Sequence, residues 1–271
     1  MVIEKNVILL KLGGSVLTNK NKPFSIRKKV VKSSVRQIID ADEKVILIHG
    51  GGSFGHPLAK RYQISKGLDK NVTNQILGVA ETHHAMIKFN NYLVNTFLGF
   101  NYPVLSIQPS SIFINDSKVT SAKFLDVIET ALDLSLLPIL YGDIIFDKQG
   151  SFSIISGDQI ILELCQHLHG YNVSKVVFAM ESDGLYIVDD SVSGDYKLVT
   201  ECYSNSLDIL NLADLGQKID VTGGIKGKLD FIKTICKLKI PVQLINGLID
   251  GNIYKSLTNQ KLNCTSILIN E

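Results

Sequence analysis

The chain has 271 residues, of which 45% are hydrophobic and 20% are charged, a composition typical of a soluble globular protein. Its 28 basic and 26 acidic side chains leave a net charge of +2, which is too small to attract DNA or an acidic membrane surface. The N-terminus lacks a signal-peptide pattern, and no apolar run is as long as a membrane span, which needs about 18 residues. The four cysteines form no C-x-x-C pair. We therefore expect a cytoplasmic protein with reduced thiols.

Short apolar runs alternate with stretches of helical periodicity along the chain. In chain order, the sequence predicts strands at residues 7–10, 45–49, 104–107, 137–141, 175–180 and 242–245, and helices at 27–40, 72–100, 158–169 and 226–239. Near-continuous apolar runs are typical of strands buried on both faces, and their alternation with helices favours parallel pairing. The expected fold class is therefore α/β, a three-layer αβα sandwich with a mainly parallel central sheet.

A hairpin and a lobe boundary are expected in the middle of the chain. Residues 147–150, Asp-Lys-Gln-Gly, separate apolar runs at 144–146 and 152–155 and predict a hairpin turn, which would make the sheet mixed. No internal repeat or low-complexity linker divides the chain. We therefore expect a single domain, with a tight boundary between two lobes within residues 164–171.

Five glycine-containing turns stand where strands end or helices begin. They are residues 11–15 (KLGGS), 49–56 (HGGGSFGH), 156–158 (SGD), 183–184 (DG) and 220–224 (DVTGG). Ligands of parallel sheets collect at the carboxyl ends of the strands, where loop N–H groups and helix N-termini attract anions. Only three of the basic residues are arginines, so a phosphate site in this chain would use lysines and backbone N–H groups.

The loop after the second predicted strand also has the spacing of a dinucleotide fingerprint. Gly50, Gly52 and Gly55 form G-x-G-x-x-G, and Asp69 is a candidate for the acidic residue that binds the ribose. An NAD-dependent oxidoreductase is therefore one alternative. His56 and Pro57 directly after the glycines, together with the equally glycine-rich loop at 11–15, fit a phosphate acceptor better, and the chain contains no P-loop.

In this order, the five motifs resemble those of the amino acid kinase superfamily, from Lys11 to Lys228. Within it, His56 after the triple glycine makes the chain most similar to archaeal-type isopentenyl phosphate kinases. Fosfomycin kinases share that histidine, and relatives with the same glycine motifs act on UMP, glutamate, acetylglutamate or carbamate, so these acceptors remain alternatives. A noncatalytic nucleotide-binding protein is a third alternative, which the joint presence of Lys11, Asp158 and Lys228 disfavours.

The resemblance implies a fold, a reaction and two lobes that bind different substrates. The fold is the amino acid kinase fold, a single domain over residues 1–271 with an acceptor lobe at about 1–165 and an ATP lobe at about 166–271. The reaction is ATP-dependent phosphorylation of isopentenyl phosphate to isopentenyl diphosphate, which belongs to isoprenoid precursor synthesis by an alternative mevalonate route. Mg²⁺ carried by ATP, small-molecule substrates and a homodimer are expected, with no nucleic acid or membrane partner.

The resemblance also assigns the catalytic residues. Lys11 and Lys228 bind the transferring phosphoryl group, and Lys20 helps to guide it. Asp158 holds the lysine ammonium groups in place, although it is equally a candidate N-cap for a helix that starts at Gln159. His56 donates a hydrogen bond to the acceptor phosphate.

The remaining assignments concern binding. The expected ATP-binding residues are Lys11, Leu12, Gly13, Gly14, Ser15, Gly52, Asp183, Tyr186, Thr222, Gly224 and Lys228. The expected acceptor-binding residues are Gly51, Gly55, His56 and Gly157 for the phosphate, and Met86, Phe89, Leu93 and Ile155 for the apolar tail. Where relatives have an acidic, apolar, acidic, glycine run, this chain has Glu181-Ser182-Asp183-Gly184. No protein ligand for a metal is expected, and the histidines at 83, 84, 167 and 169 are expected on helix surfaces.

Overall fold

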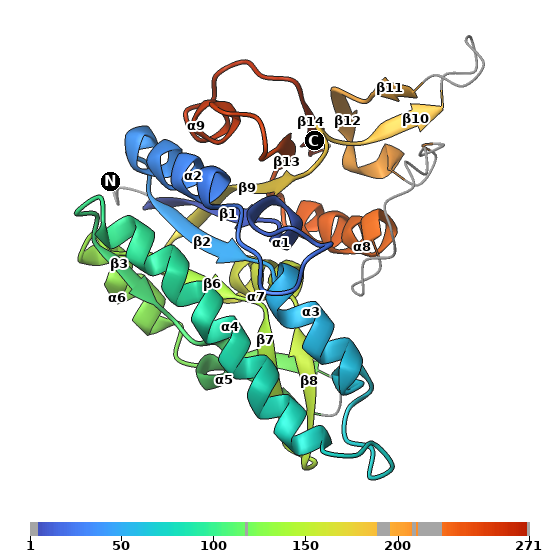
Figure 1. Ribbon diagram of the computed structural model, residues 1–271. Helices are drawn as coiled ribbons and strands as arrows, with labels where there is room; N and C mark the ends of the chain where they lie inside the picture. The colour runs from blue at the N-terminus through green and yellow to red at the C-terminus, as the bar shows by residue number, and fades with distance from the viewer. Residues whose placement is uncertain (1–4, 117–118, 189–195, 208–209, 211–223, 270–271) are drawn as a thin grey trace.

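The structure is a computed structural model that describes residues 5–116, 119–188, 196–207, 210 and 224–269. Within these residues an eight-stranded sheet crosses the molecule (Figure 1). Its strand order is β12 (Glu201–Tyr203), β14 (Cys264–Leu268), β13 (Val242–Asn246), β9 (Asn172–Met180), β1 (Asn6–Leu12), β2 (Val45–His49), β6 (Leu137–Tyr141) and β3 (Val104–Ser106). Neighbouring strands pair in parallel except for β13 and β14.

Two smaller sheets flank the large one. One contains β5 (Val119–Ala122), β4 (Phe113–Asp116), β7 (Asp143–Asp147) and β8 (Ser151–Ile155), and the other pairs β10 (Tyr186–Val188) with β11 (Tyr196–Leu198). The described helices are α1 (Gly14–Leu17), α2 (Lys28–Ala41), α3 (Gly52–Arg61), α4 (Gln75–Leu98), α5 (Pro109–Ile112), α6 (Asp126–Asp133), α7 (Gly157–His167), α8 (Gly224–Lys237) and α9 (Asn252–Leu257), with 3₁₀ turns at Ile64–Lys66 and Ser204–Ser206.

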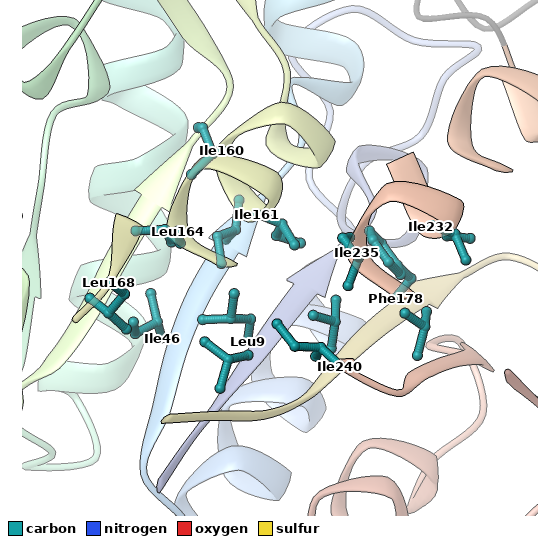
Figure 2. Close-up of a cluster of buried hydrophobic side chains, with 14 of the residues drawn as sticks. Leu9, Ile46, Ile160, Ile161, Leu164, Leu168, Phe178, Ile232, Ile235 and Ile240 are labelled. Carbon is teal, nitrogen blue, oxygen red and sulfur yellow. The ribbon is translucent and has the colours of Figure 1, made fainter. Parts of the chain in front are cut away.

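Helices cover both faces of the large sheet because successive strand residues point to opposite sides. Leu9 and Ile46 lie in the cluster under α7 and α8, where Ile161 and Ile235 pack over them (Figure 2). Leu10 and the strand neighbours on its side lie in a second cluster with apolar residues of α2, α4 and α9. The predicted three-layer α/β sandwich is therefore confirmed.

All six predicted strands and all four predicted long helices are present, but the hairpin belongs elsewhere. Strands β7 and β8 pair antiparallel around the turn at 147–150 as predicted, yet they join β4 and β5 rather than the large sheet. The large sheet is nevertheless mixed, because β14 pairs antiparallel with β13. All four cysteines are described and none is in a disulfide. None of the described helices is long and apolar enough to cross a membrane.

The strand order brings the glycine loops together. Strand β1 lies between β2 and β9, so the carboxyl ends of these three strands are adjacent. The N–H group of Gly13 donates to the carbonyl of Ala179 at 2.9 Å, and that of Gly50 donates to the carbonyl of Leu12 at 3.1 Å. Strands from the first 165 residues form one half of the sheet and later strands form the other, with β1 and β9 at the junction.

Candidate active site

The loops after β1 and β2 lie back to back, and their glycines are required by this contact. A Cβ atom on Gly14 would lie 2.3 Å from the nitrogen of Gly52, and one on Gly50 would lie 2.8 Å from the nitrogen of Gly14. Gly52 also has a φ of +47°, which favours glycine. The G-x-G-x-x-G spacing thus follows from loop packing, and the carboxylate of Asp69 is used within its own turn by the N–H of Asn71 rather than in a nucleotide site.

Gly14→Ala is expected to destabilise the protein by about 1–3 kcal/mol, because the new methyl group overlaps backbone atoms that cannot rotate away. Gly99→Ala is the matched control, since Gly99 has a φ of −64° and its nearest atom to an added Cβ is 3.3 Å away. Thermal unfolding of both variants measures the difference. Equal melting temperatures would mean that the two loops separate freely.

A pocket opens over the carboxyl ends of β1, β2 and β9, between the two halves of the sheet. Both glycine loops, the hairpin strands and several helices contribute to its lining, which consists of Lys11, Gly13, Gly14, Ser15, Lys20, Gly50, Gly51, Gly52, Gly55, His56, Ala59, Ser65, Thr82, Met86, Gly142, Asp143, Ile144, Ile154, Ile155, Ser156, Gly157, Asp158, Phe178, Ala179, Met180, Glu181 and Lys228. All five predicted catalytic residues are among them.

Two lysine ammonium groups converge on one buried carboxylate in this pocket. The Nζ atoms of Lys11 and Lys228 lie 2.6 and 2.8 Å from the same oxygen, Oδ1 of Asp158. Both ammonium groups also lie over the ring of Phe178, at 5.9 and 4.8 Å from its centre. Strand β1, helix α7 and helix α8 each supply one charged group, so the cluster forms only when the three elements are packed together.

The charges of the cluster depend on one another. Burial alone would raise the pKa of Asp158, but the charges and hydrogen bonds of Lys11 and Lys228 outweigh burial and hold this pKa below its usual range. Burial lowers the pKa of Lys11 to about 8, against the attraction of Asp158 and with the repulsion of Lys228. At neutral pH the cluster therefore carries one negative and two positive charges, a net positive centre that suits a phosphate.

Asp158 does not cap its helix. The N-cap of α7 is Ser156, whose side-chain oxygen accepts a hydrogen bond from the N–H of Gln159 at 3.1 Å. Asp158 lies in the first helical turn, where a carboxylate is favoured by the helix dipole. Of the two roles that the sequence allowed for Asp158, the structure shows the contact with lysines and not the cap.

His56 lies on a helix rather than in an irregular turn. Helix α3 starts at Gly52, so the positive end of its dipole lies beside the pocket and His56 follows one turn later. Met86 of α4 packs against this turn, because its sulfur would lie 2.9 Å from a Cβ on Gly55 and 3.4 Å from one on Gly51. Helices α3 and α4 run side by side (Figure 1), and both contribute residues to the pocket lining.

The apolar wall of the pocket differs in part from the predicted one. Met86 and Ile155 line the pocket, but Phe89 and Leu93 do not. Both lie on the apolar face of α4 but inside the core: the ring centre of Phe89 lies 4.7 Å from that of His49 on β2 and 4.8 Å from that of Phe54 on α3. The wall is completed instead by Ala59, Ile144 and Ile154, which come from α3 and the hairpin.

The predicted ATP-binding residues are only partly brought together. Gly13, Gly14, Ser15 and Gly52 line the pocket beside the lysines, whereas Leu12 points into the core with no exposed surface. Asp183 and Tyr186 lie outside the pocket lining, with the Tyr186 hydroxyl donating to Asp183 Oδ2 at 3.0 Å. Asp183 Oδ1 is buried and has no hydrogen-bond partner among the described residues. Thr222 lies outside the described residues, and Gly224 is the first residue of α8.

One predicted surface histidine, His83, contacts a residue of the pocket lining, Asp143. His83 Nδ1 lies 2.7 Å from Oδ1 of Asp143, whose side chain is completely buried at the start of β7, directly after Gly142 at the pocket. The hydrogen bond to Asp143 raises the pKa of His83. This pair joins α4 to the hairpin. Its members are 60 positions apart in sequence, so no local sequence pattern predicts the contact. The other three histidines of that prediction are exposed: His84 is on α4 and His167 ends α7, as predicted, but His169 lies two residues beyond that helix.

Comparison with known proteins agrees with this geometry. The profile of the amino acid kinase family matches residues 6–246. An isopentenyl phosphate kinase from Methanocaldococcus jannaschii is 36% identical over 93% of this chain and 95% of its own length, and one from Methanothermobacter thermautotrophicus is 29% identical over 96% and 98%. A solved isopentenyl phosphate kinase structure superimposes with a TM-score of 0.80 and 25% identity, covering 96% of this chain and 100% of that one. The chain therefore belongs to the amino acid kinase family.

Proposed function

We propose that this chain transfers the γ-phosphoryl group of ATP to isopentenyl phosphate and releases isopentenyl diphosphate and ADP. The observation that carries the proposal is the cluster of Lys11, Asp158 and Lys228, which places two ammonium groups on one buried carboxylate in a glycine-lined pocket. The two relatives named isopentenyl phosphate kinase match nearly the whole chain, which supports this acceptor over UMP, fosfomycin or acetylglutamate.

The reaction needs charge neutralisation and alignment rather than a base. An oxygen of the acceptor phosphate forms a bond to the γ-phosphorus, and the bond from that phosphorus to the bridging oxygen of ADP breaks, so ADP leaves with the electron pair. The attacking oxygen is already ionised near neutral pH, because the second pKa of a phosphate monoester is about 6. Lys11 and Lys228 would lie against the oxygens that gain charge, and Asp158 would keep both ammonium groups in place.

The acceptor is proposed to occupy the side of the pocket formed by α3, α4 and the hairpin. Its phosphate would lie against Gly51, Gly55 and Gly157 and accept a hydrogen bond from the His56 side chain. Its five-carbon tail would lie against Met86, Ile154 and Ile155, where apolar surface replaces water. This side comes mainly from residues before 166, which supports an acceptor lobe at about 1–165 and an ATP lobe at about 166–271.

ATP is proposed to enter from the side of β9 and α8, with its phosphates over Gly13, Gly14, Ser15 and Lys228 and its nucleoside toward Asp183, Tyr186 and Gly224. Mg²⁺ supplies further neutralisation of the phosphate oxygens when it is bound. The described residues contain no group of three His, Cys, Asp or Glu side chains placed to hold a metal. A magnesium ion that takes its ligands mainly from ATP phosphates and water fits such a pocket.

Self-association is a separate part of the proposal. Large apolar side chains are exposed on and beside α6, namely Phe124, Val127 and Leu134 at 74%, 47% and 69%. Exposed apolar patches on soluble proteins mark contact surfaces, which supports a homodimer. Light scattering on the purified protein measures its mass directly.

An ADP-release assay across several acceptors tests the function. We expect the highest kcat/KM with isopentenyl phosphate or its isomer dimethylallyl phosphate, because the pocket pairs phosphate-binding groups with an apolar wall. Fosfomycin, UMP and acetylglutamate should each be poorer acceptors, since none presents a phosphate on a short apolar chain. A higher kcat/KM with any of these three would reassign the substrate, and NAD binding without ADP release would replace the kinase with an oxidoreductase.

A further inference from the structure

Glu181, directly after strand β9, contacts two cationic side chains, those of Arg27 and Lys20. Its Oε1 atom accepts a hydrogen bond from Nη2 of Arg27 at 3.0 Å, and its Oε2 atom lies 3.8 Å from Nζ of Lys20. Lys20 and Glu181 both line the pocket that contains the lysine cluster. One carboxylate therefore connects the segment between α1 and α2 with the strand that leads to the nucleotide side.

Arg27 is the fixed partner of this carboxylate. Its Nε atom donates to the carbonyl of Thr18 at 3.1 Å, and its backbone N–H donates to the carbonyl of Leu17 at 2.8 Å. Thr18 is itself fixed, because its hydroxyl donates to Gly14 and accepts from the N–H of Ser53. These contacts tie the position of Glu181 to both glycine loops.

Lys20 is the exchangeable partner. At 3.8 Å its contact with Glu181 is an ion pair too long for a hydrogen bond, and 38% of the Lys20 side chain is exposed. Exposed ion pairs of this kind contribute little to stability, so Lys20 can leave Glu181 at small cost. The lysine cluster differs, since its side chains are largely buried and both of its ammonium groups lie within 2.8 Å of the carboxylate.

We propose that Glu181 is a positioning residue for Lys20: anchored by Arg27, it holds the Lys20 ammonium at the pocket until the phosphates of ATP and acceptor draw it onto the transferring group. This inference rests on the proposed function, which places Lys20 on that group. Arg27 leaves Glu181 partly neutralised when Lys20 departs, so the carboxylate does not remain as an unpaired negative charge beside the incoming phosphates.

A double-mutant cycle on Lys20 and Glu181 tests the inference. Glu181→Gln should lower kcat by about tenfold, with little change in the KM of the acceptor, because Lys20 loses its starting position but the phosphate site is intact. Lys20→Met should lower kcat more, and adding Glu181→Gln to Lys20→Met should have no further effect. Independent, multiplicative losses in the double variant would overturn the inference.

Two further measurements distinguish positioning from metal binding and from a role in the fold. If Glu181 instead binds Mg²⁺, Glu181→Gln should raise the Mg²⁺ concentration needed for half-maximal rate; an unchanged requirement supports positioning. In Arg27→Gln, Glu181 keeps its negative charge and Lys20 remains its cationic partner. This change should lower kcat in the wild-type background and should have no effect on kcat in the Lys20→Met variant. The same loss in both backgrounds would mean that Arg27 acts only on the fold.

Glu201→Gln is the matched control, since Glu201 is an exposed glutamate on β12 outside the pocket lining. It should leave kcat, KM and the melting temperature unchanged. Wild-type protein that releases no ADP with isopentenyl phosphate would refute the proposed function. Active wild-type protein with independent effects of Lys20 and Glu181 would refute only the inference.

Discussion

Replacing Lys11 or Lys228 with Met should lower kcat at least about a hundredfold while the protein stays folded. Each ammonium contacts Oδ1 of Asp158, so either variant leaves that carboxylate with one cation and keeps the buried charge paired. Methionine retains most of the volume of the lysine side chain and removes only its charge. The loss should appear in kcat, because charge on the transferred oxygens develops in the transition state.

Lys175→Met provides the control for removing a partly buried lysine. Lys175 is on β9, but its ammonium donates to the side-chain oxygen of Asn259 at 2.7 Å, outside the pocket lining. We expect normal turnover from this variant. Near-normal turnover in both Lys11→Met and Lys228→Met, with circular dichroism unchanged, would remove the cluster from the mechanism.

The same charge predicts a pH profile. Burial lowers the pKa of Lys11 to about 8, so in the free enzyme the ammonium is present below this pH and is lost as the pH rises through it. The value of kcat/KM reports groups of the free enzyme and should therefore decline above about pH 8. In Lys11→Arg the guanidinium stays charged, so whatever activity remains should persist to higher pH. A decline at the same pH in Lys11→Arg would assign the profile to another group.

Replacing His56 with Ala should weaken use of the acceptor by about 10- to 150-fold in kcat/KM. A hydrogen bond from the imidazole to a dianionic phosphate is charge-assisted and contributes about 1.5–3 kcal/mol. If the bond is equally strong before and during transfer, the KM of isopentenyl phosphate rises and kcat holds; if it strengthens during transfer, kcat falls as well. The KM of ATP should change little in either case.

Two variants complete this experiment. His56→Gln should recover part of the loss, because the amide still donates a hydrogen bond. His84→Ala removes an exposed histidine of α4 and should leave the kinetics unchanged. Unaltered acceptor kinetics with a lower melting temperature in His56→Ala would assign His56 to the stability of α3, and the preference for a phosphate acceptor would lose its main support.

The amino-acid sequence by itself determined the layers of the fold and the polar part of the pocket. The strands β1, β2, β6, β9 and β13 contain near-continuous apolar runs, the pattern typical of strands buried on both faces of a sheet. Glycines follow β1 and β2 where two backbones must approach closely. Lys11 lies two residues before Gly13, and Asp158 directly follows Gly157. These are local requirements, so each can be seen within about ten residues of sequence.

Tertiary structure alone decided which side chains share the apolar wall and which ion pairs form. Met86, Phe89 and Leu93 have the same helical spacing, but only the first faces the pocket, because α4 turns the other two toward the sheet. Arg27 and Glu181 are 154 positions apart and meet because β1 and β9 are neighbours. Hydrophobic periodicity indicates that a residue is buried but not what it packs against, and charge pairing over such separations depends on the order of the strands.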